Sequence, residues 1–200
     1  MPAPQRDRRT DGRPEQARPR DRTGRPLPRD TPEPSLTEDH EPRTVEEALE
    51  LGIALWDERR YFEAHECLEH VWHASPEPDA DLWQGVIQIA VAGVHLQRGN
   101  PVGAATLLRR AAERLVRYPD GYRGIEVDRA RHFCEQARSE IAAGRPADVR
   151  IPRFPRTAAG AWFTPDADAD SPPTTSTPVP DEPVWLTAGR RRRPQIRGME

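Results

Sequence analysis

Imidazole and carboxylate side chains share one face of a helical segment in the first half of the chain. His65 and Glu69 are four residues apart, so a helix places them side by side. The large apolar side chains of Phe62 and Trp72 flank them on either side, which predicts that both are at least half buried. Glu66 lies further round the helix, towards solvent. A buried imidazole beside a carboxylate can bind a metal ion or transfer a proton.

A narrow polar stripe crosses the next segment. Residues 79–98 are apolar on nearly every side, which indicates a central, buried helix. On its helical wheel, Gln84, Gln88 and His95 fall within about 40° of one another. Buried polar groups need hydrogen-bond partners, and the nearest candidates are on the preceding helix. We therefore expect one buried polar cluster with Glu66 at its rim; its members are His65, Glu69, Gln84, Gln88 and His95.

Such a cluster could hold a divalent metal ion, zinc being one candidate. The expected ligands are two imidazoles and one carboxylate: His65, His95 and Glu69. Three protein ligands leave room for a water molecule, which Glu66 would activate as the catalytic base, while Gln84 and Gln88 would contact the substrate. The alternative is a hydrogen-bond network without metal that fixes how the helices pack. The residues alone leave both interpretations open.

The His65-Glu66 pair resembles the start of the HExxH helix of metalloproteases. That motif needs a second histidine four positions after the first, and here this position is Glu69. The departure argues against a peptidase of that class.

Five helices are predicted in the middle of the chain. The first begins with a capping box, in which Thr44 is the N-cap and Glu47 follows three positions later. Proline and glycine residues separate the later segments, and no segment alternates with the period of a strand. The predicted helices cover residues 44–59, 61–73, 79–98, 101–118 and 126–143.

A weak internal repeat relates the first two pairs of helices. Gly99-Asn100-Pro101 follows Arg59-Arg60-Tyr61 after about forty residues, and in both places a helix ends and another begins. This pattern is typical of stacked helical hairpins, similar to tetratricopeptide repeats, whose usual period of about 34 residues is shorter. The predicted fold class is all-α: a compact bundle of about five helices built from two helical hairpins.

The remaining chain is predicted to form two disordered arms, residues 1–42 and 157–200. Both are rich in proline and charge and poor in apolar residues, so they cannot bury enough surface to offset the entropy of ordering. Residues 43–156 are expected to form the helical domain. Within the second arm, Val184-Trp185-Leu186 is an apolar triplet before Arg190–Arg193, and Trp185 is a candidate anchor for a protein partner.

Composition narrows the remaining possibilities. The net charge is −3 and no nucleic-acid-binding motif occurs, so nucleic acid is not the expected partner; a small molecule or a protein is. Cys67 and Cys134 lack the spacing of a zinc ribbon. No apolar stretch resembles a signal peptide or a membrane span, which predicts a cytoplasmic protein without membrane association.

Residues 52–104 resemble the bacterial and archaeal domain-of-unknown-function family 309. The resemblance rests on Tyr61-Phe62-Glu63-Ala64-His65-Glu66, on Gln84-Gly85-Val86-Ile87-Gln88 and His95, and on Gly99-Asn100-Pro101. It implies a small all-α bundle and, because members are described as predicted metal-dependent hydrolases, a hydrolase with its site between the second and third helices. The alternative is a non-catalytic helical-hairpin interaction module whose polar cluster is structural.

Overall fold

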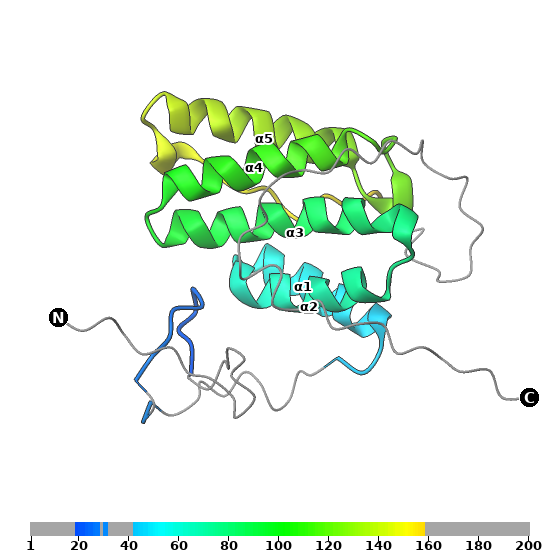
Figure 1. The fold of residues 1–200 in the computed structure, drawn as a ribbon, viewed down its shortest axis with the longest axis horizontal. Coiled ribbons are helices and arrows are strands. Elements are labelled where there is room, and N and C mark those ends of the chain that lie inside the picture. Colours follow the sequence, from blue (N-terminus) through cyan, green and yellow to red (C-terminus); the bar gives the residue numbers. More distant parts are fainter. Residues whose placement is uncertain (1–18, 29, 32–41, 159–200) are drawn as a thin grey trace, which may run out of the picture. The chain divides into compact units, whose positions relative to one another are not determined.

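The computed structural model describes residues 19–28, 30–31 and 42–158. The all-α fold class is confirmed: the described residues form five α-helices and two short 3₁₀ turns (Figure 1). The helices are α1 (Val45–Asp57), α2 (Tyr61–Ala74), α3 (Glu77–Gln97), α4 (Pro101–Leu115) and α5 (Val127–Ala142). The 3₁₀ turns are η1 (Tyr122–Gly124) and η2 (Pro146–Asp148). Trp185, the predicted anchor for a protein partner, lies outside the described residues.

Local signals set the helix ends. Thr44 caps α1 by accepting a hydrogen bond from the Glu47 amide, 3.1 Å away, as the capping box predicts. Asn100 caps α4 through the Gly103 amide at 2.9 Å. α3 begins at Glu77, two residues earlier than expected, because Pro78 lies in the first turn, where a missing N–H costs no hydrogen bond.

The helices pack in the order in which they follow one another. α1 packs on α2, α2 on α3, α3 on α4 and α4 on α5, and Figure 1 shows α3 between the first hairpin and α4. α3 is the most buried helix, as its apolar surface predicts. Gly85 and Gly93 allow its neighbours to approach closely, since a Cβ at either position would meet Leu115 or Tyr61 at less than 3 Å. The arrangement is that of stacked helical hairpins.

An extended segment, residues 149–157, returns across the bundle after α5. Its anchor is Phe154, which is 2% exposed and packs edge-on against Trp56 at 5.3 Å between ring centroids. The Trp56 indole donates to the Pro152 carbonyl at 2.9 Å, and the Phe154 amide donates to Asp57 at 2.8 Å. Beyond this point the Glu126 amide donates to the Pro155 carbonyl at 2.9 Å. The segment thus joins the first hairpin to the loop that precedes α5.

Residues 19–28 form a tight turn within the arm that composition predicts to be unstructured. The Asp21 carboxylate accepts bonds from the Thr23 amide at 2.8 Å and from the Arg25 amide at 2.9 Å. The Leu27 amide donates to the Pro19 carbonyl at 2.7 Å and closes the turn. Polar bonds rather than apolar burial hold this segment, which explains why its composition gave no sign of it.

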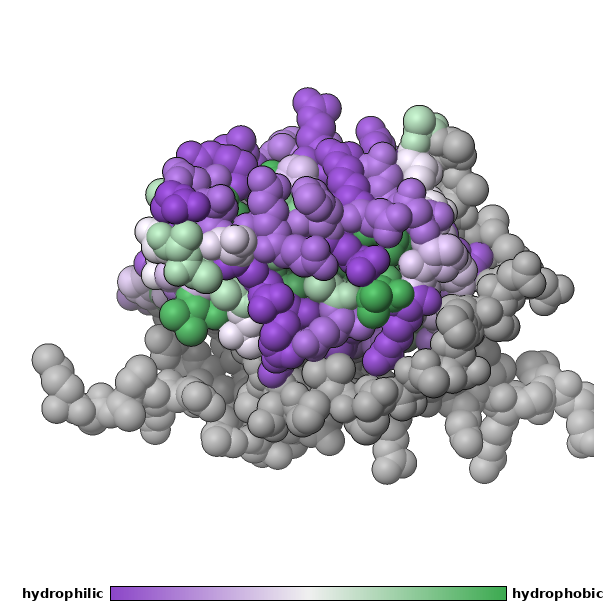
Figure 2. Space-filling view, turned by 90° about the horizontal axis from the view of Figure 1, so that it is seen from above, coloured by the Kyte–Doolittle hydropathy of each residue, from purple (hydrophilic) through white to green (hydrophobic). Residues whose placement is uncertain are grey.

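The surface above α4 and α5 is mainly hydrophilic, with small, separate hydrophobic areas (Figure 2). Among the described residues, Val102 and Val116 are the large hydrophobic side chains that are well exposed. None of the helices in the described part combines the length and the hydropathy that a membrane span requires.

Candidate functional site

α2 positions the three titratable side chains that the sequence singled out. Ala64, Leu68 and Val71 are fully buried and fix this helix against the bundle. Further round the helix from this apolar face, His65 and Glu69 are half-buried and Glu66 is exposed. His65 and Glu69 are therefore more buried than Glu66, as the helical wheel predicts.

The His65 ring is held by its own helix. Its Nδ1 contacts the Phe62 carbonyl oxygen, and the two rings are in tilted contact, with 4.8 Å between their centroids. Because a carbonyl only accepts, Nδ1 carries the hydrogen and Nε2 keeps its lone pair. Burial lowers the pKa of His65 to about 4; the Phe62 contact opposes this shift, and the Arg98 and Arg20 charges add to it. At neutral pH this side chain is an uncharged base or ligand.

The two glutamates beside it bind protons more tightly than usual. Burial, and then the neighbouring Glu69 carboxylate, raise the pKa of Glu66 to about 7, while the Arg20 charge opposes the shift. Burial also raises the pKa of Glu69. Glu66 still reaches solvent, where water screens charge–charge interactions. A carboxyl group that titrates near neutral pH can both give and take a proton.

Two of the three polar residues of α3 bond to α4 or to its N-cap. Gln84 accepts a hydrogen bond from the Arg114 guanidinium at 2.9 Å. His95 Nδ1 pairs with the Asn100 side-chain amide at 2.9 Å, in the loop that begins α4. Gln88 is 1% exposed, and its Oε1 has no hydrogen-bond partner within the described part of the chain. The expected source of hydrogen-bond partners was α2; the bonds of Gln84 and His95 to α4 and its N-cap were not expected, and the convergence of the five residues stays a prediction.

A three-ligand metal site is not assembled among residues 19–28, 30–31 and 42–158. They contain no group of three or more His, Cys, Asp or Glu side chains placed to hold a metal ion. His65, Glu69 and His95, the expected ligands, do not form such a set. The donor arrangement therefore does not fit the metal that the family resemblance implies, and we derive no chemical step through one.

A buried ionic network, which the sequence analysis missed, joins the start of α3 to η1. Asp79 is fully buried, accepts a bond from the Tyr122 hydroxyl at 2.8 Å and pairs with the Arg123 guanidinium at 2.8 Å. Burial and the bond to Asp79 raise the pKa of Tyr122 to about 12. Nearby, Asp81 pairs with Arg117. Acidic residues near the start of α3 and arginines after the end of α4 were the available signal.

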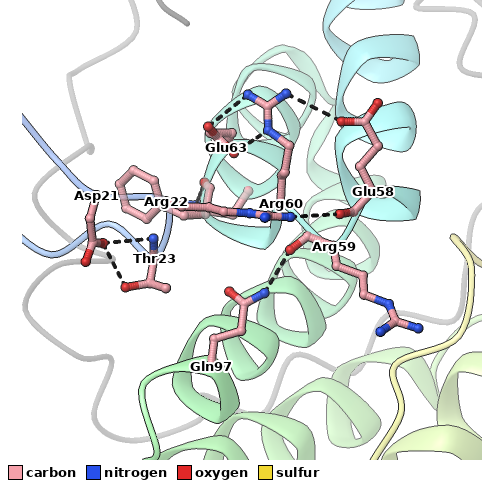
Figure 3. A network of polar contacts seen from close by, with 10 residues as sticks. Asp21, Arg22, Thr23, Glu58, Arg59, Arg60, Glu63 and Gln97 are labelled. Atoms are coloured by element: carbon pink, nitrogen blue, oxygen red, sulfur yellow. Dashed lines mark hydrogen bonds and ion pairs between the residues drawn. The ribbon is translucent and has the colours of Figure 1, made fainter. Parts of the chain in front are cut away.

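The turn of residues 19–28 docks beside α2, where the ends of α1 and α3 meet. Arg22 donates to the Glu58 carbonyl at 3.3 Å, and the Arg98 guanidinium donates to the Thr23 carbonyl at 2.8 Å. The Arg20 guanidinium lies over the Phe62 ring, 5.7 Å from its centroid. Figure 3 shows this corner, with Asp21 bonded inside the turn and Arg22 reaching Glu58. The turn therefore lies next to the ring contact between Phe62 and His65.

Comparison with known proteins finds a family model that matches part of the helical region. Residues 49–107 match the model of DUF309, described as a domain of unknown function. This part of the chain is similar to DUF309. The match runs from α1 into α4, so α5 and the segment 149–157 lie outside the part that the family model covers.

Two curated proteins match part of the chain. An uncharacterised protein of Aquifex aeolicus is 28% identical over 105 residues, which are 52% of this chain and 32% of that protein. The uncharacterised protein YpuF of Bacillus subtilis is 45% identical over 51 residues, 25% of this chain and 29% of YpuF. The matched regions thus span about a third of the relatives' length. No solved structure matches the chain significantly.

The neutral state of His65 makes the stability of the helical domain depend on pH. Its lowered pKa means that unfolding takes up a proton between about pH 6.5 and pH 4, so the free energy of unfolding falls as the pH falls through this window. We expect wild type to lose on the order of 1 kcal/mol more than His65→Gln between pH 7 and pH 5, measured by urea unfolding. His132→Gln, at an exposed position, should keep the wild-type dependence. Parallel profiles for wild type and His65→Gln would contradict the assignment.

Proposed function

We propose that this helical domain is an interaction module of stacked helical hairpins that binds segments of polypeptide. The observation that carries the proposal is that the helices already hold two non-helical segments of their own chain through main-chain groups. Trp56 donates to the Pro152 carbonyl, and Arg98 donates to the Thr23 carbonyl. Hydrogen bonds to the main chain, with an aromatic anchor such as Phe154, are a common mode of peptide recognition.

The packing order supports the same function. Helical-hairpin repeats contact mainly their neighbours in sequence and expose continuous surfaces for partners. Here α1 to α5 pack in sequence order, and Gln84 and His95 are engaged by α4. These two side chains therefore contribute to the helix packing. The Trp185 triplet is a second proposed anchor for a protein partner, on residues that the structure does not describe.

A metal-dependent hydrolase is the second candidate, and one observation favours it. The pKa of Glu66 is about 7, which suits general acid–base catalysis at neutral pH. In the neighbouring His65 side chain, Nε2 is unprotonated and can accept a proton or a metal ion. The catalytic role of Glu66 and a substrate contact of Gln88 belong to this candidate. A metal on His65 and Glu69 would need a further ligand beyond the described set.

Metal content separates the two functions. The full chain is purified without chelator and without a His tag, as wild type, His65→Ala and His132→Ala, and divalent metals are counted by elemental analysis. The interaction module predicts equal, negligible metal in all three proteins. Stoichiometric metal in wild type and His132→Ala that is lost in His65→Ala would overturn the module in favour of the hydrolase.

A positive test of the module uses partners from the native host. A protein that co-purifies with the chain in fixed stoichiometry is identified, purified separately and titrated against the chain by calorimetry. Reconstitution of a one-to-one complex supports the module. Failure of every co-purified protein to rebind would contradict it.

A further inference from the structure

Two helices end side by side at the corner where the turn docks. α1 ends at Asp57 with Glu58 as its C-cap, and α3 ends at Gln97 with Arg98 as its C-cap. The Gln97 side chain donates to the Arg59 carbonyl at 2.8 Å and links the two ends (Figure 3). The last carbonyls of a helix lack partners within it and carry the negative end of its dipole. The corner therefore offers acceptors to a pair of cations.

The docked turn supplies those cations at matching positions. Arg22 donates to the Glu58 carbonyl at 3.3 Å, and Arg25 donates to the Arg98 carbonyl at 3.1 Å. Arg98 in turn donates through Nε to the Thr23 carbonyl at 2.8 Å. Each helix end thus binds one arginine of the turn. Arg98 hydrogen-bonds to the main chain at Thr23, between Arg22 and Arg25.

The tip of the turn approaches the Phe62 ring so closely that only glycine fits there. Gly24 has a φ of +76°, which favours glycine, and a Cβ built on it would lie 2.0 Å from the Phe62 ring. Asp21 holds the turn in shape through the Thr23 and Arg25 amides. Shape and charge together define a short sequence, Asp-Arg-x-Gly-Arg.

We propose that this corner is a recognition site for an arginine-bearing tight turn of a partner protein, with Asp21–Arg25 as its displaceable resident. The inference rests on the proposed interaction function and names its binding surface and the chemistry of its partner. The resident turn belongs to the same chain as α1, so it competes at an effective concentration on the order of millimolar. A partner turn binds when it outcompetes the resident, and it then lies beside the Phe62–His65 ring contact.

The test measures binding of a labelled peptide, residues 18–29 of this chain, to the full-length protein by fluorescence anisotropy. Gly24→Val in the protein should release the resident turn, because valine resists a positive φ and clashes with Phe62. The peptide should then bind about tenfold or more tightly than to wild type. Gly144→Val is the matched control, since Gly144 also has a φ of +76° but no atom lies within 4 Å of its Cβ position.

Two further variants address specificity. Adding Arg98→Ala to Gly24→Val should weaken the peptide several-fold, and a peptide that itself carries Gly24→Val should not bind. Equal affinity of wild type and Gly24→Val, absence of saturable binding, or indifference to Arg98→Ala would each overturn the proposal. Melting curves of every variant check folding. The metal analysis does not involve the turn, so the proposed function and this inference can fail separately.

Discussion

Replacing Asp79 by alanine will lower the free energy of unfolding by about 3–5 kcal/mol, the usual cost of breaking a buried ion pair. Asp79 is fully buried and is the acceptor for Tyr122 and the ion-pair partner of Arg123, each at 2.8 Å. Its removal leaves a guanidinium and a hydroxyl without their partner. Arg123 also has a φ of 48°, a left-handed conformation that the surrounding contacts must maintain.

Urea unfolding followed by circular dichroism measures the Asp79→Ala effect. Glu135→Ala is the matched control, because Glu135 is an exposed acidic residue of α5. It should change the free energy of unfolding by less than about 0.5 kcal/mol. A loss below about 1 kcal/mol for Asp79→Ala would show that the network around η1 does not hold α3 to the loop before α5.

Phe154→Ala will have an effect of similar size, about 3–5 kcal/mol, although Phe154 lies in no helix. Its side chain fills the space beside Trp56, so truncation leaves a cavity and loses the edge-on aromatic contact. The bonds of Trp56 to Pro152 and of Asp57 to Phe154 depend on the same docking. The whole segment should loosen.

Chemical unfolding gives the free-energy change for Phe154→Ala, and limited proteolysis reports on the segment itself. Cleavage near residues 149–157 should become faster. Arg153→Ala, at the exposed position next to Phe154, serves as the control and should leave stability and cleavage unchanged. A Phe154→Ala protein that is as stable as this control would mean that the segment contributes little to the fold.

The helices and their caps were predictable because their signals are local. Thr44 with Glu47, and Asn100 with Gly103, lie within four residues of each other, and the apolar surface of α3 is visible in sequence. The half-burial of His65 followed from the same periodicity.

The partners of the polar residues were not predictable in the same way. Gln84 bonds Arg114, thirty residues further on. A helical wheel shows which side chains share a face but not which neighbouring helix covers that face. The bonds of Gln84 to Arg114 and of His95 to Asn100 are a property of three-dimensional packing, which a helical wheel does not contain.

The turn at residues 19–28 illustrates a second limit. Mean composition predicts no structure there, because the segment has almost nothing apolar to bury. Its stability comes from one carboxylate, Asp21, and from arginines that reach two helix ends. Such pairings depend on the exact order of the residues, which composition averages away.

The segment 149–157 changes the connectivity of the whole stack. In an open array of hairpins, each helix is supported only by its neighbours, so the last helix can detach while the first remains folded. Here Phe154 is bound at Trp56 of α1, while Pro155 is bound at Glu126, just before α5. The segment therefore connects the first helix of the array to the start of the last one. Because this segment contacts both α1 and the residue before α5, we expect the five helices to unfold together as one cooperative unit.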